Sequence, residues 1–165
     1  MPSQGHTKLH AQDFLGYVRA FNSTNYPAQH AYYTNDVELV LPDPAIPTLK
    51  GSSAIMDHYK PIHASADEIV VPIIVMSDRG RLFLQMETYF HYKEEVKRAV
   101  HDYHVHAGDV VKIHCCAIYH LDDDGKMKRI TCYGFSQELL GQVDIEEKIR
   151  ESESRADADL RLNNY

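Results

Sequence analysis

The sequence predicts an α+β fold, in which a cone-shaped, curved antiparallel sheet wraps around three N-terminal helices. Apolar residues near the start follow the spacing of one helix face: Leu9, Phe14, Leu15, Val18 and Phe21. From Asp67 onward the chain instead becomes rich in β-branched and aromatic residues, in runs separated by polar turns. Because the helices precede the strands and do not alternate with them, we expect one sheet with the helices packed on one face.

The remaining elements follow in order along the chain. Pro27 suits a first helical turn and begins a short second helix. A strand over 36–41 is stopped by prolines, and Gly51 opens a third helix. Four longer strands follow, with a polar excursion over 93–108 between the second and the third: 68–76, 81–92, 109–121 and 126–136. We expect residues 1–141 to form one domain, and the charged residues 142–165 to form a solvated helical tail with a frayed end.

Composition argues against several classes of protein. The chain has 165 residues, which is typical of one domain, and its formal net charge of −7 argues against nucleic-acid binding. The longest strongly apolar run, residues 69–76, is far shorter than the ~20 residues of a membrane-spanning helix. The three cysteines are an odd number and two are adjacent, so no disulfide framework is expected. With no secretory signal visible, we expect a cytoplasmic protein.

Four stretches of sequence carry a family resemblance: YVRAFNSTN (17–25), YYTNDVELVLPDP (32–44), LKGSSAIMDHY (49–59) and YHLDDDGKMKRITCYGF (119–135). In this order they resemble the first helix, the passage into the first strand, the loop and third helix, and the last hairpin of the nuclear-transport-factor-2-like superfamily. The similarity points to the SnoaL-like, ketosteroid isomerase-like and scytalone dehydratase-like branch and covers about residues 9–136. It implies a cone-shaped fold whose enzymes usually work without a cofactor.

The resemblance also implies roles for individual residues. Tyr17 matches the ketosteroid isomerase tyrosine that donates to the developing enolate, and Tyr59 matches the tyrosine that supports it. The general-base aspartate of that enzyme falls at Leu41 without gaps, or at Asp43 if the Asp-Pro pairs are matched. Its second, protonated aspartate is replaced here by Ala117.

The strand over 81–92 has two faces, and the sequence leaves open which of them lines the pocket. One face carries the polar residues Glu87, Tyr89 and His91, which would form an acid–base ladder inside the cone. The other face carries Met86 and Phe90, which the ketosteroid isomerase resemblance places inside. His91 is also the nearest match to a catalytic histidine of scytalone dehydratase, although the other histidine of that enzyme has no counterpart here.

The strand over 109–121 is easier to interpret. Its apolar set, which includes Cys115, Ala117 and Tyr119, is expected to face the interior. Cys115 and Cys132 are expected to be pocket or core thiols and not nucleophiles, because no cationic cluster is evident that would lower their pKa. The resemblance implies a homodimer formed through the outer face of the sheet, by Lys112, His114, Cys116, Thr131 and Tyr133.

Three histidines of the polar excursion, His101, His104 and His106, raise the question of a metal site, because neutral imidazoles suit zinc or copper. Their spacing matches no standard ligand set, and a fixed site needs rigid support. We therefore expect no metal, and the excursion is either a lid over the pocket or a solvated loop. His63 is expected to be exposed at the end of its helix.

These features predict a cofactor-independent isomerase or cyclase that acts on a mostly apolar polycyclic or polyketide-like metabolite of natural-product biosynthesis, by general acid–base catalysis. The alternatives are a dehydratase of the scytalone dehydratase type and a non-catalytic module for small-molecule binding or dimerisation. An epoxide hydrolase ranks below them, because Arg129 lacks clear aspartate partners. The candidate catalytic residues are Tyr17, Asp43, Tyr59, Glu87 and His91. The candidate substrate-binding residues are Leu41, Met86, Tyr89, Cys115, Ala117, Tyr119 and Cys132.

Overall fold

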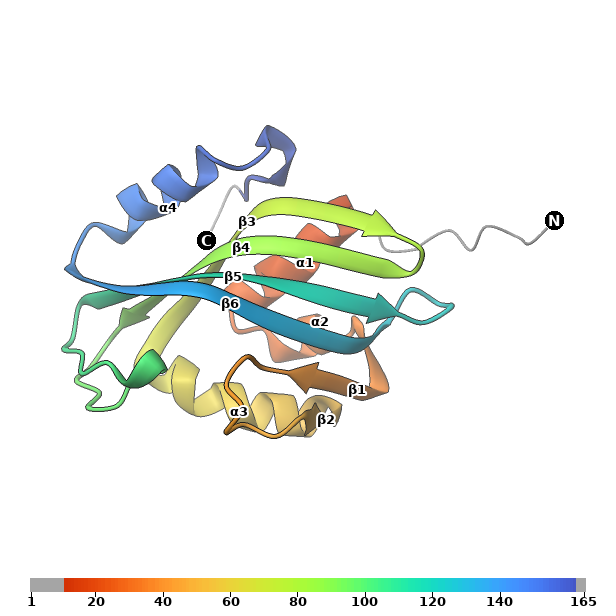
Figure 1. The fold of residues 1–165 in the computed structure, drawn as a ribbon, viewed down its shortest axis with the longest axis horizontal. Helices are drawn as coiled ribbons and strands as arrows, with labels where there is room; N and C mark the ends of the chain where they lie inside the picture. Colours follow the sequence, from red (N-terminus) through yellow and green to blue (C-terminus); the bar gives the residue numbers. More distant parts are fainter. Residues whose placement is uncertain (1–10, 163–165) are drawn as a thin grey trace.

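A bent sheet forms the frame of the protein (Figure 1). The computed structural model describes residues 11–162, so Leu9 of the predicted first helix lies outside the described residues. The strands pair in the order β2-β1-β6-β5-β4-β3. All neighbouring strands are antiparallel except β1 and β6, which makes the sheet mixed. The strands are β1 (Tyr33–Val40), β2 (Leu49–Lys50), β3 (Ala66–Asp78), β4 (Arg81–Tyr92), β5 (Asp109–Leu121) and β6 (Met127–Gln142).

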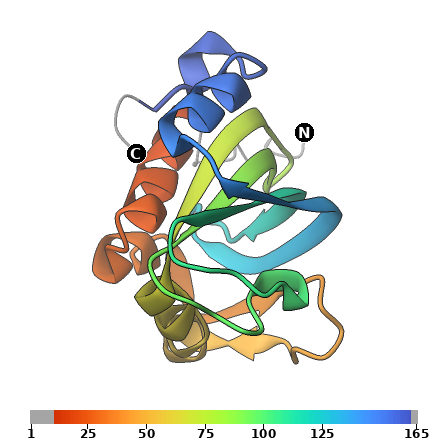
Figure 2. The ribbon, with the colours of Figure 1, turned by 90° about the vertical axis from the view of Figure 1, so that its left-hand side faces the viewer.

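Three helices cover the inner face of the sheet, as predicted (Figure 2): α1 (Ala11–Asn22), α2 (Tyr26–His30) and α3 (Gly51–Ser65). The apolar stripe of α1 is buried, with Phe14, Leu15 and Val18 no more than 2% exposed. The side-chain oxygen of Asn25 accepts a hydrogen bond from the backbone nitrogen of Ala28 (3.2 Å) and thereby caps α2. None of the described helices is both long and apolar enough to cross a bilayer.

Irregular pairing bends the sheet around its core. The register of β3 against β4 shifts between Pro72 and Ile74, and the register of β5 against β6 shifts between His114 and Cys115. Bulges of this kind increase the local twist and bend the strand that carries them. The main core lies between the bent sheet and the helices, and it includes Phe14 and Val37.

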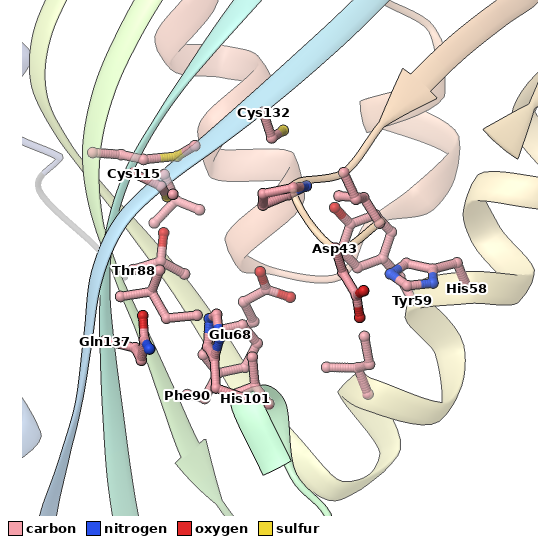
Figure 3. A pocket seen from close by; sticks show the side chains of 18 of the residues that line it. Asp43, His58, Tyr59, Glu68, Thr88, Phe90, His101, Cys115, Cys132 and Gln137 are labelled. Carbon is pink, nitrogen blue, oxygen red and sulfur yellow. The ribbon is translucent and has the colours of Figure 1, made fainter. Parts of the chain in front are cut away.

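The alternation of side chains along β4 decides which of its residues face the interior. Thr88 and Phe90 point inward and line a cavity (Figure 3). Glu87, Tyr89 and His91 therefore lie on the outer face of the sheet, and the prediction that they line the pocket is corrected. β4 pairs with β5 without a register shift, so no bulge turns these three side chains inward.

The C-terminal segment returns onto the outer face of the sheet (Figure 1). Its helix α4 (Ile145–Glu153) is capped by Asp144, whose carboxylate accepts from the backbone nitrogen of Glu146 (3.0 Å). Ile149 packs against Tyr89 and its neighbours on the sheet, and a short 3-10 turn, η2 (Ala158–Leu160), brings Leu160 into the main core. The predicted helical tail is present. One face of the helix is buried, because apolar residues recur on that face. The expectation of a solvated tail is therefore corrected.

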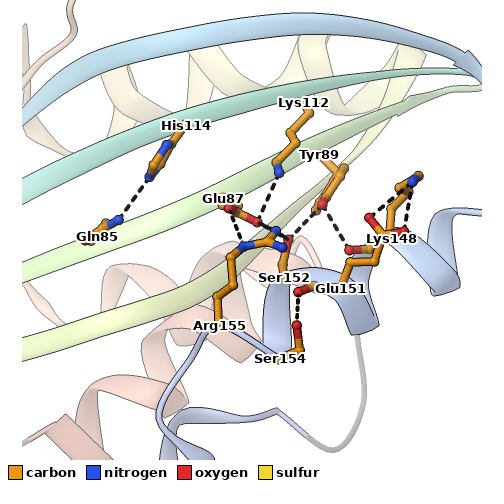
Figure 4. A network of polar contacts seen from close by, with 10 residues as sticks. All are labelled: Gln85, Glu87, Tyr89, Lys112, His114, Lys148, Glu151, Ser152, Ser154 and Arg155. Carbon is orange, nitrogen blue, oxygen red and sulfur yellow. Dashed lines mark hydrogen bonds and ion pairs between the residues drawn. The ribbon is translucent and has the colours of Figure 1, made fainter.

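A polar network centred on Glu87 joins this segment to the sheet (Figure 4). Arg155 donates to Glu87 through Nε (3.1 Å) and Nη2 (2.5 Å), and the hydroxyl of Ser152 also donates to the carboxylate. Lys112 lies 3.2 Å from the same carboxylate. The Tyr89 hydroxyl donates to the carbonyl oxygen of Lys148 (3.0 Å). Glu87 is therefore a structural anchor for the C-terminal segment.

We predict that Glu87→Gln lowers the free energy of unfolding at neutral pH. Burial by itself raises the pKa of Glu87, but the hydrogen bonds from Arg155 and Ser152 and the charge of Lys112 outweigh it and lower the pKa from 4.5 to about 2. A depressed carboxyl pKa stabilises the folded state above the unfolded pKa, and this stabilisation is lost as the pH falls from 4.5 towards 2. The free energy of unfolding of Glu87→Gln is expected to be lower than that of the wild type by on the order of 2–3 kcal/mol at pH 7. This difference should shrink towards zero near pH 2.

Urea denaturation at a series of pH values measures this difference. Glu94→Gln is the matched control, because Glu94 is exposed, and its stability should follow the wild-type curve. A pH-independent gap between Glu87→Gln and the wild type would contradict the assignment, since the charge of Glu87 would then not be the source of the stabilisation.

Candidate functional site

A cavity of about 990 Å³ lies between the inner face of the sheet and the helices α1 and α3 (Figure 3). Its volume is at the upper end of the roughly 300–1,000 Å³ typical of small-molecule sites. The walls are mostly apolar and include Val18, Phe21, Val70, Leu84 and Ile130. The loop after β1 and the segment 93–108 form part of the wall. A cavity of this size and lining suits a largely apolar ligand.

The predicted site residues divide between the two faces of the sheet. Three of the candidate catalytic residues line the cavity: Tyr17, Asp43 and Tyr59. Five of the candidate substrate-binding residues also line it: Leu41, Met86, Cys115, Tyr119 and Cys132. Ala117 is fully buried in the main core and is not part of the cavity wall. Glu87, Tyr89 and His91 lie outside the cavity because they occupy the outer face of β4.

Tyr17 belongs to a buried chain of polar groups. Its hydroxyl lies 2.9 Å from that of Tyr33, and Gln29 donates to the Tyr33 hydroxyl over 2.9 Å. The Tyr33 oxygen accepts from Gln29, so the Tyr33 hydroxyl can donate its own hydrogen to the Tyr17 oxygen. The hydrogen of Tyr17 can then be offered to the neighbouring Tyr119 hydroxyl or to a ligand. Burial raises the pKa of Tyr17 well above 10, with the neighbouring Tyr33 and Tyr119 adding to the effect, so the phenol remains a neutral donor.

Tyr59 and Tyr119 extend this phenolic wall. Tyr59 comes from α3 and packs edge-on against Phe21, with ring centroids 5.4 Å apart. Tyr119 comes from β5 and packs against Tyr17 at 5.8 Å. Burial raises the pKa of both phenols well above 10. The cavity therefore offers hydrogen-bond donors from α1, α3 and β5, and these donors stay neutral at physiological pH.

Glu68 is the buried carboxylate of the cavity (Figure 3). It is 9% exposed, and its Oε2 lies 3.0 Å from Nε2 of His63. The other ring nitrogen of His63, Nδ1, lies 2.8 Å from the hydroxyl of Tyr26. Burial raises the pKa of Glu68, and the hydrogen bond and charge of His63 oppose that rise. A hydrogen-bonded chain thus runs from the cavity through a buried imidazole to a partly exposed phenol.

Sequence reasoning missed Glu68 and placed His63 wrongly. His63 was expected to be exposed at the helix end, but it is 8% exposed, because it packs on Tyr59 and Tyr26 with ring centroids 5.4 and 5.9 Å apart. The sequence did contain a signal for Glu68. Glu68 and Val70 are two residues apart on β3, so their side chains should point to the same, inner face of the sheet. A single acidic residue on the inner face of an apolar strand is therefore worth testing as a cavity residue.

Asp43 stands at the mouth of the cavity, in the loop that follows β1. Its side chain is exposed, and Oδ1 accepts a hydrogen bond from the backbone nitrogen of Ala45 (2.9 Å). Figure 3 shows its carboxylate directed towards the cavity, with that of Glu68 opposite. From this position Asp43 can hold or orient a polar end of a ligand.

The segment 93–108 covers part of the cavity, which matches the lid alternative and not the solvated loop. Val96, Ala99, Val100 and His101 all line the wall. The segment contains a short 3-10 turn, η1 (Val100–Asp102), in which His101 has φ 56° and ψ 31°. A left-handed conformation costs a non-glycine residue about 1–2 kcal/mol. This turn places His101 at the cavity wall (Figure 3).

The cavity thiols are not nucleophiles at neutral pH. Burial raises the pKa of Cys115 to about 12 and that of Cys132 to about 12. Only the thiolate is an effective nucleophile, so both side chains act as small wall residues.

Structural comparison relates the chain to solved proteins of the same fold. A candidate polyketide cyclase from Xanthomonas campestris pv. campestris is 20% identical, with 86% of this chain and 96% of that chain covered and a TM-score of 0.61. One from Pseudomonas putida is 18% identical, with 86% and 97% covered and a TM-score of 0.60. The epoxide hydrolase/cyclase-like enzyme SalBIII, described in pyran ring formation in the polyether salinomycin, is 12% identical, with 78% and 95% covered and a TM-score of 0.60. At these identities the likeness shows the fold alone.

Sequence comparison assigns the family. No curated protein matches the chain. The model of the SnoaL-like domain, however, matches residues 14–130, a range that contains most of α1, the cavity-lining strands β3 to β5 and the first residues of β6. Because this match spans well over half of the chain, the protein belongs to the SnoaL-like domain family.

Proposed function

We propose that the protein is a cofactor-independent isomerase or cyclase that acts on a mostly apolar polycyclic or polyketide-like metabolite. The observation that carries this proposal is Glu68, a carboxyl group with a raised pKa in a cavity of mostly apolar walls. A general acid or base works best when its pKa lies near the operating pH, and burial is the usual way to raise a carboxyl group towards it.

Glu68 is the group that moves the proton. In its ionised form it removes a proton from a carbon next to a carbonyl group, and in its protonated form it returns the proton to another carbon of the same skeleton. Removal of a proton to form an enolate is the step that isomerisation and aldol-type cyclisation share. In isomerisation the proton returns to another carbon; in an aldol-type cyclisation the enolate carbon bonds to a second carbonyl carbon of the substrate, and the proton goes to the oxygen of that carbonyl group. Atoms balance within the substrate, so no co-reactant is needed.

His63 and Tyr26 position Glu68 and connect it to solvent. A neutral His63 with its proton on Nε2 donates to the ionised carboxylate and accepts from the Tyr26 hydroxyl at Nδ1. When solvent supplies a proton at the Tyr26 hydroxyl, Tyr26 passes its own proton to Nδ1 and Nε2 passes its proton to Glu68, so that the carboxyl group then donates to Nε2. The chain lets the proton held by Glu68 exchange with solvent.

Phenols supply the second half of the mechanism. Tyr17 and Tyr59 are neutral donors, and a donor directed at a carbonyl oxygen stabilises the enolate that forms when the adjacent carbon loses its proton. Asp43 at the mouth orients the polar end of the substrate. A role in natural-product biosynthesis is supported by the likeness in fold to candidate polyketide cyclases.

The second candidate function is a non-catalytic small-molecule-binding module. It is favoured by the hydrogen bond between Glu68 and His63, because a carboxylate that already has a partner can be structural. A designed binder of 17-OHP shares the fold, with 12% identity, 78% of this chain and 92% of that chain covered and a TM-score of 0.57. The dehydratase alternative loses its main support, since His91 lies on the outer face.

We predict that the wild type accelerates solvent deuterium exchange next to the carbonyl group of a bicyclic ketone such as β-tetralone. Glu68→Gln keeps the size of the side chain but cannot accept the proton, so the exchange rate should fall at least about 100-fold. Proton NMR in deuterated buffer measures the exchange, and Asp67→Asn is the matched control on the exposed neighbouring residue. Full exchange in Glu68→Gln would remove Glu68 from the mechanism, whereas binding of the ketone without exchange would favour the binding module.

We also predict that Glu68 titrates above 4.5 and that His63→Asn raises its pKa further, because burial raises the pKa while His63 lowers it. A raised carboxyl pKa means that the folded state binds more protons than the unfolded state between the two values. Stability therefore falls as the pH rises through this window, and more steeply in His63→Asn. Carbon-13 NMR of the carboxyl groups gives the midpoints, with His114→Asn, on the outer face of the sheet, as control. A lower midpoint in His63→Asn would contradict this coupling.

We further propose a homodimer through the part of the outer sheet face that α4 leaves uncovered. Tyr133 and Phe135 on β6 are 49% and 64% exposed, and Phe135 packs on His114 with ring centroids 5.6 Å apart. Exposed aromatic residues of this kind are typical of interfaces.

We predict a dimer at micromolar concentration for the wild type and a monomer for Tyr133→Glu, because the new charge would be buried in the interface. Sedimentation equilibrium measures both. Lys60→Glu, a charge change of the same kind on the exposed side of α3, should remain a dimer. A monomeric wild type would refute the proposed interface.

A further inference from the structure

The segment 93–108 is held in a hairpin-like shape by one pair of residues. Val96 and Val105 exchange two backbone hydrogen bonds, each 3.0 Å long, which form an isolated antiparallel bridge. Val105 is fully buried, and it packs with Val96 in a small core that also contains Phe90 and Tyr92. The two arms of the segment therefore face each other in a fixed register around this bridge.

This register brings three metal-binding side chains together on the outer side of the hairpin. His104 and His106 flank the buried Val105, so both point away from the core. The antiparallel register places Glu95, next to Val96, across from His106. The carboxylate and the two imidazoles offer ligand atoms that all lie within 4.8 Å of one another. His104 Nε2 lies 2.7 Å from Oε1 of Glu95, and the rings of His104 and His106 are 4.9 Å apart.

We propose that Glu95, His104 and His106 form a binding site for a divalent transition metal, with Zn²⁺ as the preferred ion. Two imidazoles and one carboxylate are ligands that zinc accepts, and water would complete the four-coordinate shell. Zn–N bonds of about 2.0–2.1 Å place two tetrahedral ligands about 3.3 Å apart. The side chains must therefore close by about 1.5 Å at most, which rotation of exposed side chains on a fixed backbone allows.

A second carboxylate supports the arrangement from behind. Asp109 lies 3.6 Å from Nδ1 of His106 and accepts a hydrogen bond from the backbone nitrogen of the same residue (2.8 Å). Gln142 on β6 donates to the other oxygen of Asp109 over 2.8 Å. Carboxylates in this position orient metal-bound imidazoles and raise their basicity. The start of β5 and the end of β6 thus anchor one of the ligands.

The site lies on the side of the segment that faces away from the cavity. Val96 lines the cavity, whereas its neighbour Glu95 points outward with the two histidines. A metal ion held there cannot touch a ligand inside the cavity, so it takes no part in the chemistry proposed for Glu68. It would instead join the two arms of the segment that covers the cavity and restrict their separation.

Isothermal titration of the tag-free 165-residue protein with zinc chloride tests the site. We expect one equivalent of zinc to bind with micromolar affinity. The double variant His104→Ala, His106→Ala should lose this binding, Glu95→Gln should weaken it about tenfold, and Asp109→Asn should weaken it about 10-fold or more through its effect on His106. His114→Ala is the matched control, because His114 is a histidine of the outer sheet face outside the cluster, and it should bind zinc like the wild type.

Amide hydrogen exchange with and without zinc tests the restriction of the segment. Zinc should slow the exchange of the Val96 and Val105 amides in the wild type at least about tenfold, and should leave them unchanged in the double variant. Stoichiometric binding that survives in the double variant would overturn the proposal, because the zinc would then be bound elsewhere. Absence of saturable zinc binding in the wild type would overturn it as well. Neither result bears on Glu68, since the exchange of ketone protons is measured without added metal.

Discussion

The alternation of side chains across a bent sheet is the constraint on which the site depends. A strand of this sheet has one face towards the helices and one towards the outside, and a shift of one residue exchanges the two sets. On β4 the inner set is Met86, Thr88 and Phe90, so the cavity wall is apolar there and the acidic Glu87 is outside. On β3 the same rule places Glu68 inside. The single buried carboxylate described in the cavity wall follows from these two registers.

The two buried glutamates have opposite pKa shifts because their surroundings carry different charges. Glu87 is surrounded by Arg155, Lys112 and the Ser152 hydroxyl, and its pKa falls to about 2. Glu68 has one imidazole as its partner, and burial dominates, so its pKa rises. A carboxylate with several cationic partners is permanently ionised and holds structure together. A carboxyl group whose pKa is raised can change its protonation state during a reaction.

The outer side of the molecule presents three separate surfaces. The helix α4 covers the part of the sheet around Tyr89, while Tyr133 and Phe135 on β6 stay exposed. The segment 93–108 adds a third surface, with apolar residues against the cavity and the pair His104 and His106 outward. These surfaces arise because side chains alternate along an extended segment. Each such segment directs one set of side chains to the core and leaves the other set available for contacts.

The sequence by itself determined the order of helices and strands, since the spacing of Phe14, Leu15 and Val18 and the β-rich runs after Asp67 depend on local periodicity alone. It also placed Tyr17, Tyr59 and Asp43 around one cavity through the family resemblance. Only the tertiary structure decided the face of β4, the pairing of β1 with β6, the burial of His63 and the position of α4 on Glu87. It also decided that Glu95 meets His104 and His106 across the Val96–Val105 bridge. Periodicity identifies the two faces of a strand but not which one is covered, because that depends on segments far away in the chain that pack against it.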